Sequence, residues 1–159
     1  MSDSSPRPLS DLLEGGTTLM VATREPDGTV GSRPLTVAEV DGDTISMLID
    51  STADWAMHLS DGDWVLATLS DTRDNDYATM TGRLTTTSDP ATIDRLWSPF
   101  AGAYFDEGRE SPEILVLRIG VDEGSYWDSP SGRIGSLISL VRAKVGDGED
   151  AGDHGELSV

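Results

Sequence analysis

Short runs of β-forming residues separated by turn-sized gaps are the feature that most constrains the fold. Six such runs occur, over residues 17–24, 30–40, 44–49, 64–69, 77–87 and 113–121. The gap at 25–28 carries proline and glycine, and the gap at 41–43 is an aspartate-glycine hairpin turn. Strands joined by hairpin-length connections favour an antiparallel sheet over a parallel one. We therefore expect a mainly β protein, a six-stranded antiparallel barrel with peripheral helices.

Helical patterns interrupt or flank these strands. We predict helices over residues 9–14, 51–59, 90–98 and 135–145, the last an amphipathic C-terminal helix. Ser10 is the expected N-cap of the first helix, and Ser51 or Thr52 that of the second, which would cross the barrel. Asp89 precedes Pro90, which suits the first helical position.

The chain divides into three parts on composition. Residues 1–8 are polar with two prolines and are expected to form a flexible arm, whereas residues 146–159 form an acidic, glycine-rich tail that we expect to be mobile. Residues 9–145 form the barrel domain. The run at 113–121 is apolar on both faces, and we interpret Leu115 and Leu117 as pointing outward toward a partner, which favours a dimer.

The composition excludes several classes of protein. None of the 159 residues is cysteine, so disulfides, thiolate metal sites and cysteine nucleophiles are ruled out. The formal net charge of -18 disfavours nucleic acid as a partner. No membrane helix or signal-peptide pattern is present, so we expect a cytoplasmic protein without a membrane partner. The two histidines, His58 and His154, fit no metal-binding pattern, and no serine lies in a hydrolase motif.

Arg33 is the most unusual residue of the predicted barrel. It lies in the middle of a predicted strand, where burying a charge is costly, and it is followed by Pro34, which has no N–H group for strand pairing. One interpretation is an edge-strand arginine paired with one of the many carboxylates. The other is a guanidinium held on a rigid strand to bind a phosphate group bidentately.

Several motifs in a fixed order carry a resemblance to a known family. They are Met20-Val21-Ala22-Thr23, Ser32-Arg33-Pro34-Leu35, Asp41-Gly42-Asp43, Leu96-Trp97-Ser98-Pro99, Ala103-Tyr104-Phe105, Ser125-Tyr126-Trp127-Asp128-Ser129-Pro130 and Gly152-Asp153-His154-Gly155-Glu156. Together they resemble the general stress protein branch of the pyridoxamine 5'-phosphate oxidase-like proteins, from about Leu9 to Val159. The resemblance implies a split β-barrel homodimer of the FMN-binding type, with flavin mononucleotide (FMN) in a groove at the subunit interface.

The resemblance also assigns cofactor-binding roles. It implies that Arg33 contacts the phosphate and that Pro34 and Leu35 line the isoalloxazine edge. The expected neighbours of the ribityl chain and the phosphate are Asp50, Ser51 and Thr52.

Two aromatic residues complete the predicted flavin site. The resemblance makes Trp97 and Tyr104 walls of the flavin, although aromatic residues at a helix end also commonly belong to the core.

One position departs from the family pattern. Where the family usually has a phosphate-binding lysine, this chain has Trp55, preceded by Asp54. Losing one charge-assisted hydrogen bond should weaken phosphate binding by about 2 kcal/mol. Backbone N–H groups at a helix start at this position would compensate in part.

Two functional hypotheses follow. The first is an FMN-binding stress protein acting as a flavin-dependent oxidoreductase, with no catalytic residue or substrate assigned. The second is a non-catalytic dimeric split barrel that has lost FMN or binds another flat ligand such as a deazaflavin, which Asp54 and Trp55 favour.

Overall fold

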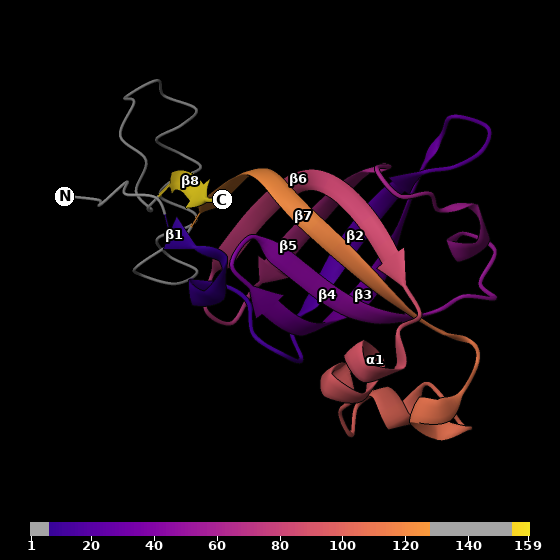
Figure 1. Cartoon of the computed structure of the whole chain (residues 1–159). Helices are drawn as coiled ribbons and strands as arrows, with labels where there is room; N and C mark the ends of the chain where they lie inside the picture. The colour runs from indigo at the N-terminus through magenta and orange to yellow at the C-terminus, as the bar shows by residue number, and fades with distance from the viewer. Residues whose placement is uncertain (1–6, 128–153) are drawn as a thin grey trace, which may run out of the picture.

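Six antiparallel strands form a closed β-barrel in the computed structural model, which describes residues 7–127 and 154–159 (Figure 1). The barrel strands are β2 (Thr18–Arg24), β3 (Val30–Asp41), β4 (Thr44–Asp50), β5 (Trp64–Asp71), β6 (Asp76–Thr87) and β7 (Ile114–Trp127). All six predicted strands are present, and the predicted mainly β, six-stranded antiparallel barrel is confirmed. Both predicted hairpin turns occur, with Gly28 and Gly42 at positive φ, the region that favours glycine.

The barrel closes where β6 meets β7. Neighbouring strands follow the order β4, β3, β2, β5, β6, and β7 pairs with both β4 and β6 to complete the ring. The β6–β7 ladder contains a bulge between Thr81 and Gly82. A Cβ atom at Gly82 would lie 2.0 Å from the Gly120 carbonyl oxygen, so the close approach of the two backbones requires glycine there.

Two apolar clusters hold the fold together. One fills the barrel interior and includes Leu117 and Ile119 of β7. The other lies outside the barrel, where Ile114 and Val116 pack against α1 (Pro90–Leu96) and the segment after it. The sequence interpretation of Leu115 and Leu117 as outward-facing is therefore wrong, because these residues pack with the barrel core and α1 of the same chain covers the outer face.

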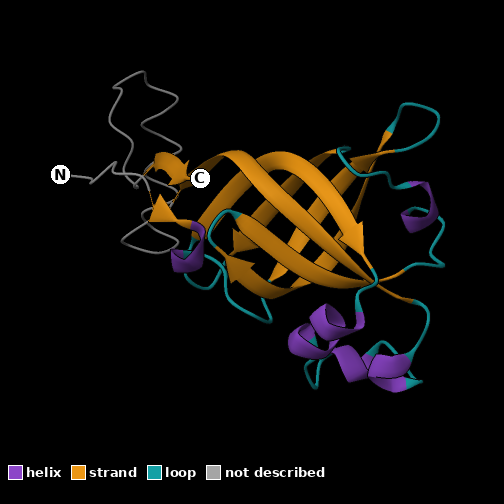
Figure 2. Ribbon diagram, viewed as in Figure 1, coloured by secondary structure: helices purple, strands orange, loops and turns teal. Residues whose placement is uncertain are grey.

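Within residues 7–127, the helical segments are shorter than predicted (Figure 2). Helix α1 begins as expected, since the Asp89 carboxylate accepts hydrogen bonds from the Thr92 hydroxyl and backbone N–H, which lower the pKa of Asp89. The other helical segments are single 3-10 turns: η1 (Leu9–Asp11), η2 (Ala56–His58), η3 (Ala101–Ala103) and η4 (Gly108–Glu110).

Two of these turns correct the sequence prediction. Pro8, not Ser10, occupies the N-cap position of η1, and it makes no side-chain cap. The predicted 51–59 helix is absent except for η2, because the side chain of Asp50 bonds the backbone N–H and hydroxyl of Thr52 and holds a local turn instead.

The ends of the described chain form a small sheet. Strand β1 (Arg7–Pro8) runs parallel to β8 (His154–Ser158), and β8 pairs antiparallel with the end of β7. Leu157 is buried in the barrel cluster. The predicted arm and tail are thus paired where they are described, while the predicted 135–145 helix lies outside the described residues. Among the described residues, no helix has the length and apolar character needed to span a bilayer.

Candidate functional site

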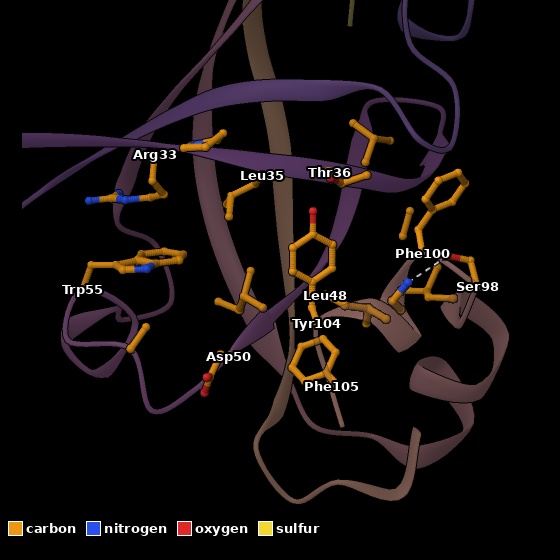
Figure 3. Close-up of a pocket in the computed structure, with 17 residues that line it drawn as sticks. Arg33, Leu35, Thr36, Leu48, Asp50, Trp55, Ser98, Phe100, Tyr104 and Phe105 are labelled. Carbon is orange, nitrogen blue, oxygen red and sulfur yellow. Dashed lines mark hydrogen bonds between the residues drawn. The ribbon is translucent and has the colours of Figure 1, made fainter. Parts of the chain in front are cut away.

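A pocket of about 410 Å³ opens on the side of the barrel, between strands β3 and β4 and the turns that follow α1 (Figure 3). One side is formed by the middle of β3 and the end of β4, and the other by η3 and its flanking residues. The lining residues are Arg33, Pro34, Leu35, Thr36, Val37, Ala38, Leu48, Ile49, Asp50, Ala53, Trp55, Leu96, Ser98, Phe100, Ala101, Tyr104 and Phe105.

The first half of β3 carries Arg33 along a free strand edge. Residues Val30 to Thr36 pair with β2, whereas pairing with β4 begins only at Val37. Pro34, which has no N–H group, is therefore compatible with this stretch of strand. The pocket thus forms where β3 departs from β4, and this departure leaves room for a ligand beside Arg33.

The Arg33 guanidinium is held by four protein groups at one end of the pocket. Its Nη1 donates to the Thr23 hydroxyl at 2.7 Å and to the Val21 carbonyl at 3.4 Å, and its Nη2 donates to Glu25 Oε1 at 2.9 Å. The guanidinium carbon also lies 4.4 Å from the centre of the Trp55 ring. Figure 3 shows the two side chains facing each other. Both sequence interpretations of Arg33 thus have a basis, because it pairs with a carboxylate and also lines a pocket.

The turn after β4 adds a carboxylate, that of Asp50, to the pocket lining. Asp50 accepts hydrogen bonds from the Thr52 hydroxyl at 2.6 Å and the Thr52 N–H at 2.8 Å, and these bonds lower the pKa of Asp50. The Ser51 N–H donates to the Glu113 carbonyl. The backbone N–H groups of Ser51 and Thr52 are therefore already bonded within the protein, and no helix start is present to offer such groups to an anion.

Aromatic residues after α1 form the opposite side. Phe100 and Tyr104 line the pocket and are 69% and 74% exposed, which are high values for such side chains. Phe105 is buried beneath them, and its ring centre lies 6.2 Å from that of Trp97. Trp97 packs with the outer apolar cluster and does not line the pocket, in agreement with the interpretation of this residue as core.

The structure brings together most of the predicted cofactor-binding residues. Those that line the pocket are Arg33, Pro34, Leu35, Asp50, Trp55 and Tyr104, whereas Ser51, Thr52 and Trp97 do not. A role in cofactor binding stays a prediction for all nine.

Sequence analysis missed several lining residues and one important partner. Thr36 and Leu48 were detectable as neighbours of the predicted residues along two paired strands, and Phe100 as part of an aromatic cluster after Pro99. Glu25 was treated only as part of a turn, although it holds Arg33.

The pocket suits a flat, largely apolar ligand. Among the described residues, Arg33 is the single cation in the lining and Asp50 the single anion. The remaining lining side chains are apolar, aromatic or hydroxyl-bearing, and the volume falls within the range of small-molecule sites. No group of three or more metal-ligating side chains is found in the described parts of the chain.

Comparison with solved structures identifies the fold. A protein from Jannaschia sp. CCS1, described as a candidate general stress protein 26, has 22% identity and a TM-score of 0.71, with 94% of each chain covered. General Stress Protein 26 from Bacillus anthracis str. Sterne has 16% identity and a TM-score of 0.61, covering 74% of this chain and 88% of its own.

A third structure has the higher identity of 27%. It is the general stress FMN/FAD binding protein from Xanthomonas citri, with a TM-score of 0.63, and the match covers 74% of this chain and 83% of that one. None of the curated proteins matches the sequence significantly. The sequence profile described as pyridoxamine 5'-phosphate oxidase like matches residues 5–150, and the chain therefore belongs to that family.

Proposed function

We propose that this protein binds a flavin, with the isoalloxazine ring in the pocket between β3 and the aromatic residues after α1. The observation that carries the proposal is an open pocket of about 410 Å³ with apolar and aromatic walls and one cation at its end. A three-ring heterocycle needs apolar surfaces for its faces and a few polar groups for orientation. Phe100 and Tyr104 are exposed on one side of the opening and Leu35 lies on the other, which supports this placement.

The expected flavin is FMN, on the family resemblance and on the flavin-binding description of the Xanthomonas citri protein. Arg33 is the one lining side chain that attracts a phosphate, so the ribityl phosphate would lie at its end of the pocket. When bound, the flavin itself supplies the redox chemistry, which would make the protein an oxidoreductase. The side chains around the pocket would orient the ring and exclude water from its faces.

The alternative function is a non-catalytic protein that has lost FMN or binds another flat ligand such as a deazaflavin. Trp55 supports this alternative, because it occupies the expected lysine position and covers the Arg33 guanidinium. The two functions share the pocket and differ in the ligand and in whether electrons are transferred.

A homodimer is part of the proposal, with the pocket at the subunit interface. The high exposure of Phe100 and Tyr104 beside the pocket supports a second surface over them. Light scattering at micromolar concentration measures the mass directly. A monomer would contradict the shared interface while leaving the single-chain pocket in place.

Titration of riboflavin and FMN fluorescence with the protein tests the binding proposal. Thr36→Trp places a large side chain inside the pocket, and we expect this variant to lose flavin binding. Ser32→Trp is the matched control, because it adds the same side chain at an exposed position on the same strand that does not line the pocket. If both variants lose flavin binding equally, or if no flavin binds to the wild type, the proposed site is wrong.

A further inference from the structure

The carboxylate of Glu25 pairs with Arg33, the pocket residue to which an anionic ligand would bind. Its Oε1 accepts from Arg33 Nη2 at 2.9 Å, and the two side chains are only 28% and 16% exposed. We propose that Glu25 is a specificity-determining residue that competes with the ligand's phosphate for Arg33, so that the pocket does not distinguish FMN from riboflavin. The inference rests on the proposed flavin site and identifies which part of the flavin that site recognises.

A glycine provides the space for this contact. In the β2–β3 hairpin, Gly31 lies opposite Thr23, between the Arg33 and Glu25 side chains. A Cβ atom at Gly31 would lie 2.2 Å from Glu25 Oε1 and 2.8 Å from Arg33 Nη2. The ion pair therefore lies over a position where any larger residue would displace the Glu25 carboxylate and press on the Arg33 guanidinium.

Trp55 fixes the guanidinium from its other side. Its ring centre is 4.4 Å from the guanidinium carbon, and Thr23 and Val21 bind Nη1. The remaining N–H groups of Arg33, at Nε and the second position of Nη2, have no partner among the described residues. Bidentate phosphate binding through them places a dianion next to the Glu25 carboxylate, and the repulsion between the two anions offsets the attraction of Arg33 for the phosphate.

The surrounding charge reinforces this competition. Asp50 lines the same pocket, and the hydrogen bonds from Thr52 lower the pKa of its carboxyl group. Among the described residues no second cation lines the pocket, and the chain carries a formal net charge of -18. At Arg33 a phosphate-bearing flavin gains one contact and meets the Glu25 carboxylate, in a pocket whose lining holds Asp50 as a second anion. Riboflavin presents the same ring and hydroxyl chain without a charge that these carboxylates repel.

The experiment compares the dissociation constants of riboflavin and FMN for four proteins: wild type, Glu25→Gln, Gly31→Ala and Glu39→Gln. Glu25→Gln keeps the side-chain shape but removes the competing charge. Gly31→Ala forces the carboxylate and the guanidinium apart while leaving both charges in the chain. Glu39→Gln is the control, because it also removes one carboxylate that pairs with an arginine. Glu39 lies on β3, as Arg33 does, but pairs with Arg95 and does not line the pocket.

In the wild type, we expect the two flavins to bind within about threefold of each other, because the phosphate gains little net free energy. In Glu25→Gln, FMN binding should tighten about tenfold, the size expected when a neighbouring carboxylate no longer repels the phosphate or shares its cation. Gly31→Ala should shift FMN in the same direction, and riboflavin should bind all four proteins alike. Glu39→Gln should leave the FMN to riboflavin ratio unchanged.

Two results would separate this inference from the proposed function. If both flavins bind but the wild type prefers FMN by tenfold or more, and Glu25→Gln leaves that preference unchanged, Glu25 does not compete and the inference fails alone. If neither flavin binds any of the four proteins, the proposed flavin site fails, and the inference fails with it.

Discussion

The contact between Glu25 and Arg33 predicts a measurable coupling energy in the absence of any ligand. The perturbation is a double-mutant cycle with Glu25→Gln, Arg33→Met and the combined variant, read as free energies of unfolding. Arg33→Met alone should destabilise the protein by about 2 kcal/mol, because it leaves the buried Thr23 hydroxyl without the Arg33 bond and removes the contact with Trp55.

The magnitude of the coupling follows from the exposure and geometry of the pair. The two groups share one hydrogen bond of 2.9 Å, and their side chains are mostly shielded from solvent. A fully exposed pair is worth about 0–1 kcal/mol, and a buried pair several times more, so we expect a coupling of about 1 kcal/mol. The pair of Glu39 with Arg95 is the comparison, since Arg95 is 55% exposed and its coupling should stay below about 0.5 kcal/mol.

Urea unfolding of the four proteins in each cycle, followed by far-ultraviolet circular dichroism, measures the coupling. Equal m-values across a cycle are the control that the variants unfold from comparable states. A Glu25–Arg33 coupling of zero, or one no larger than that of Glu39 with the exposed Arg95, would refute the contact in solution and remove the basis of the competition.

Three further predictions concern stability and the aromatic residues. Gly82→Ala should lower the free energy of unfolding by about 1–3 kcal/mol, because the added Cβ forces apart two backbones in the β6–β7 ladder. Gly120→Ala should lower it less, because its Cβ would lie 3.7 Å from the nearest neighbour; thermal unfolding of both variants measures the difference. Asp89→Ala should destabilise the protein at pH 7. The difference in unfolding free energy from the wild type should shrink as pH falls below about 4, because the pKa of the Asp89 carboxyl is lowered by hydrogen bonds present only in the folded state. A difference that stays constant from pH 7 to 2 would contradict the role of Asp89 as the N-cap of α1. Trp97→Leu should lower stability and leave flavin affinity unchanged, whereas Tyr104→Ala should weaken flavin binding and leave stability unchanged. Flavin titration and unfolding of both variants measure the two effects.

The barrel was predictable from local sequence because each strand is bounded by a turn with a specific chemical requirement. Gly28 and Gly42 adopt the positive φ that the hairpin turns need, and β3 between them alternates exposed and half-buried residues over its first half. The segment 51–59 was not predictable in the same way, because Asp50 lies just before it and its side chain captures the turn. A local bond of this kind competes directly with helix formation.

Other features depend on residues distant in sequence. The pairing of Arg7 with Leu157 joins opposite ends of the chain, and composition alone predicted both ends to be mobile. The apolar faces of β7 were recognised, but sequence could not show that α1 covers one of them.

The candidate site was predicted in part, at the residues that break a general rule. Arg33 was notable as a charge within a strand, and it lines the pocket. Its partner Glu25 was missed because the contact requires the β2–β3 register and the missing side chain at Gly31. With the hairpin register known, period-two alternation places all three residues on the same face.

A crystal structure of the protein grown with riboflavin tests the central claim most directly. We predict density for a three-ring heterocycle in the pocket, between Leu35 on β3 and Phe100 and Tyr104, with the ribityl chain directed toward Arg33. An empty pocket in crystals of a protein that binds riboflavin in solution, or a flavin bound elsewhere on the surface, would contradict the account.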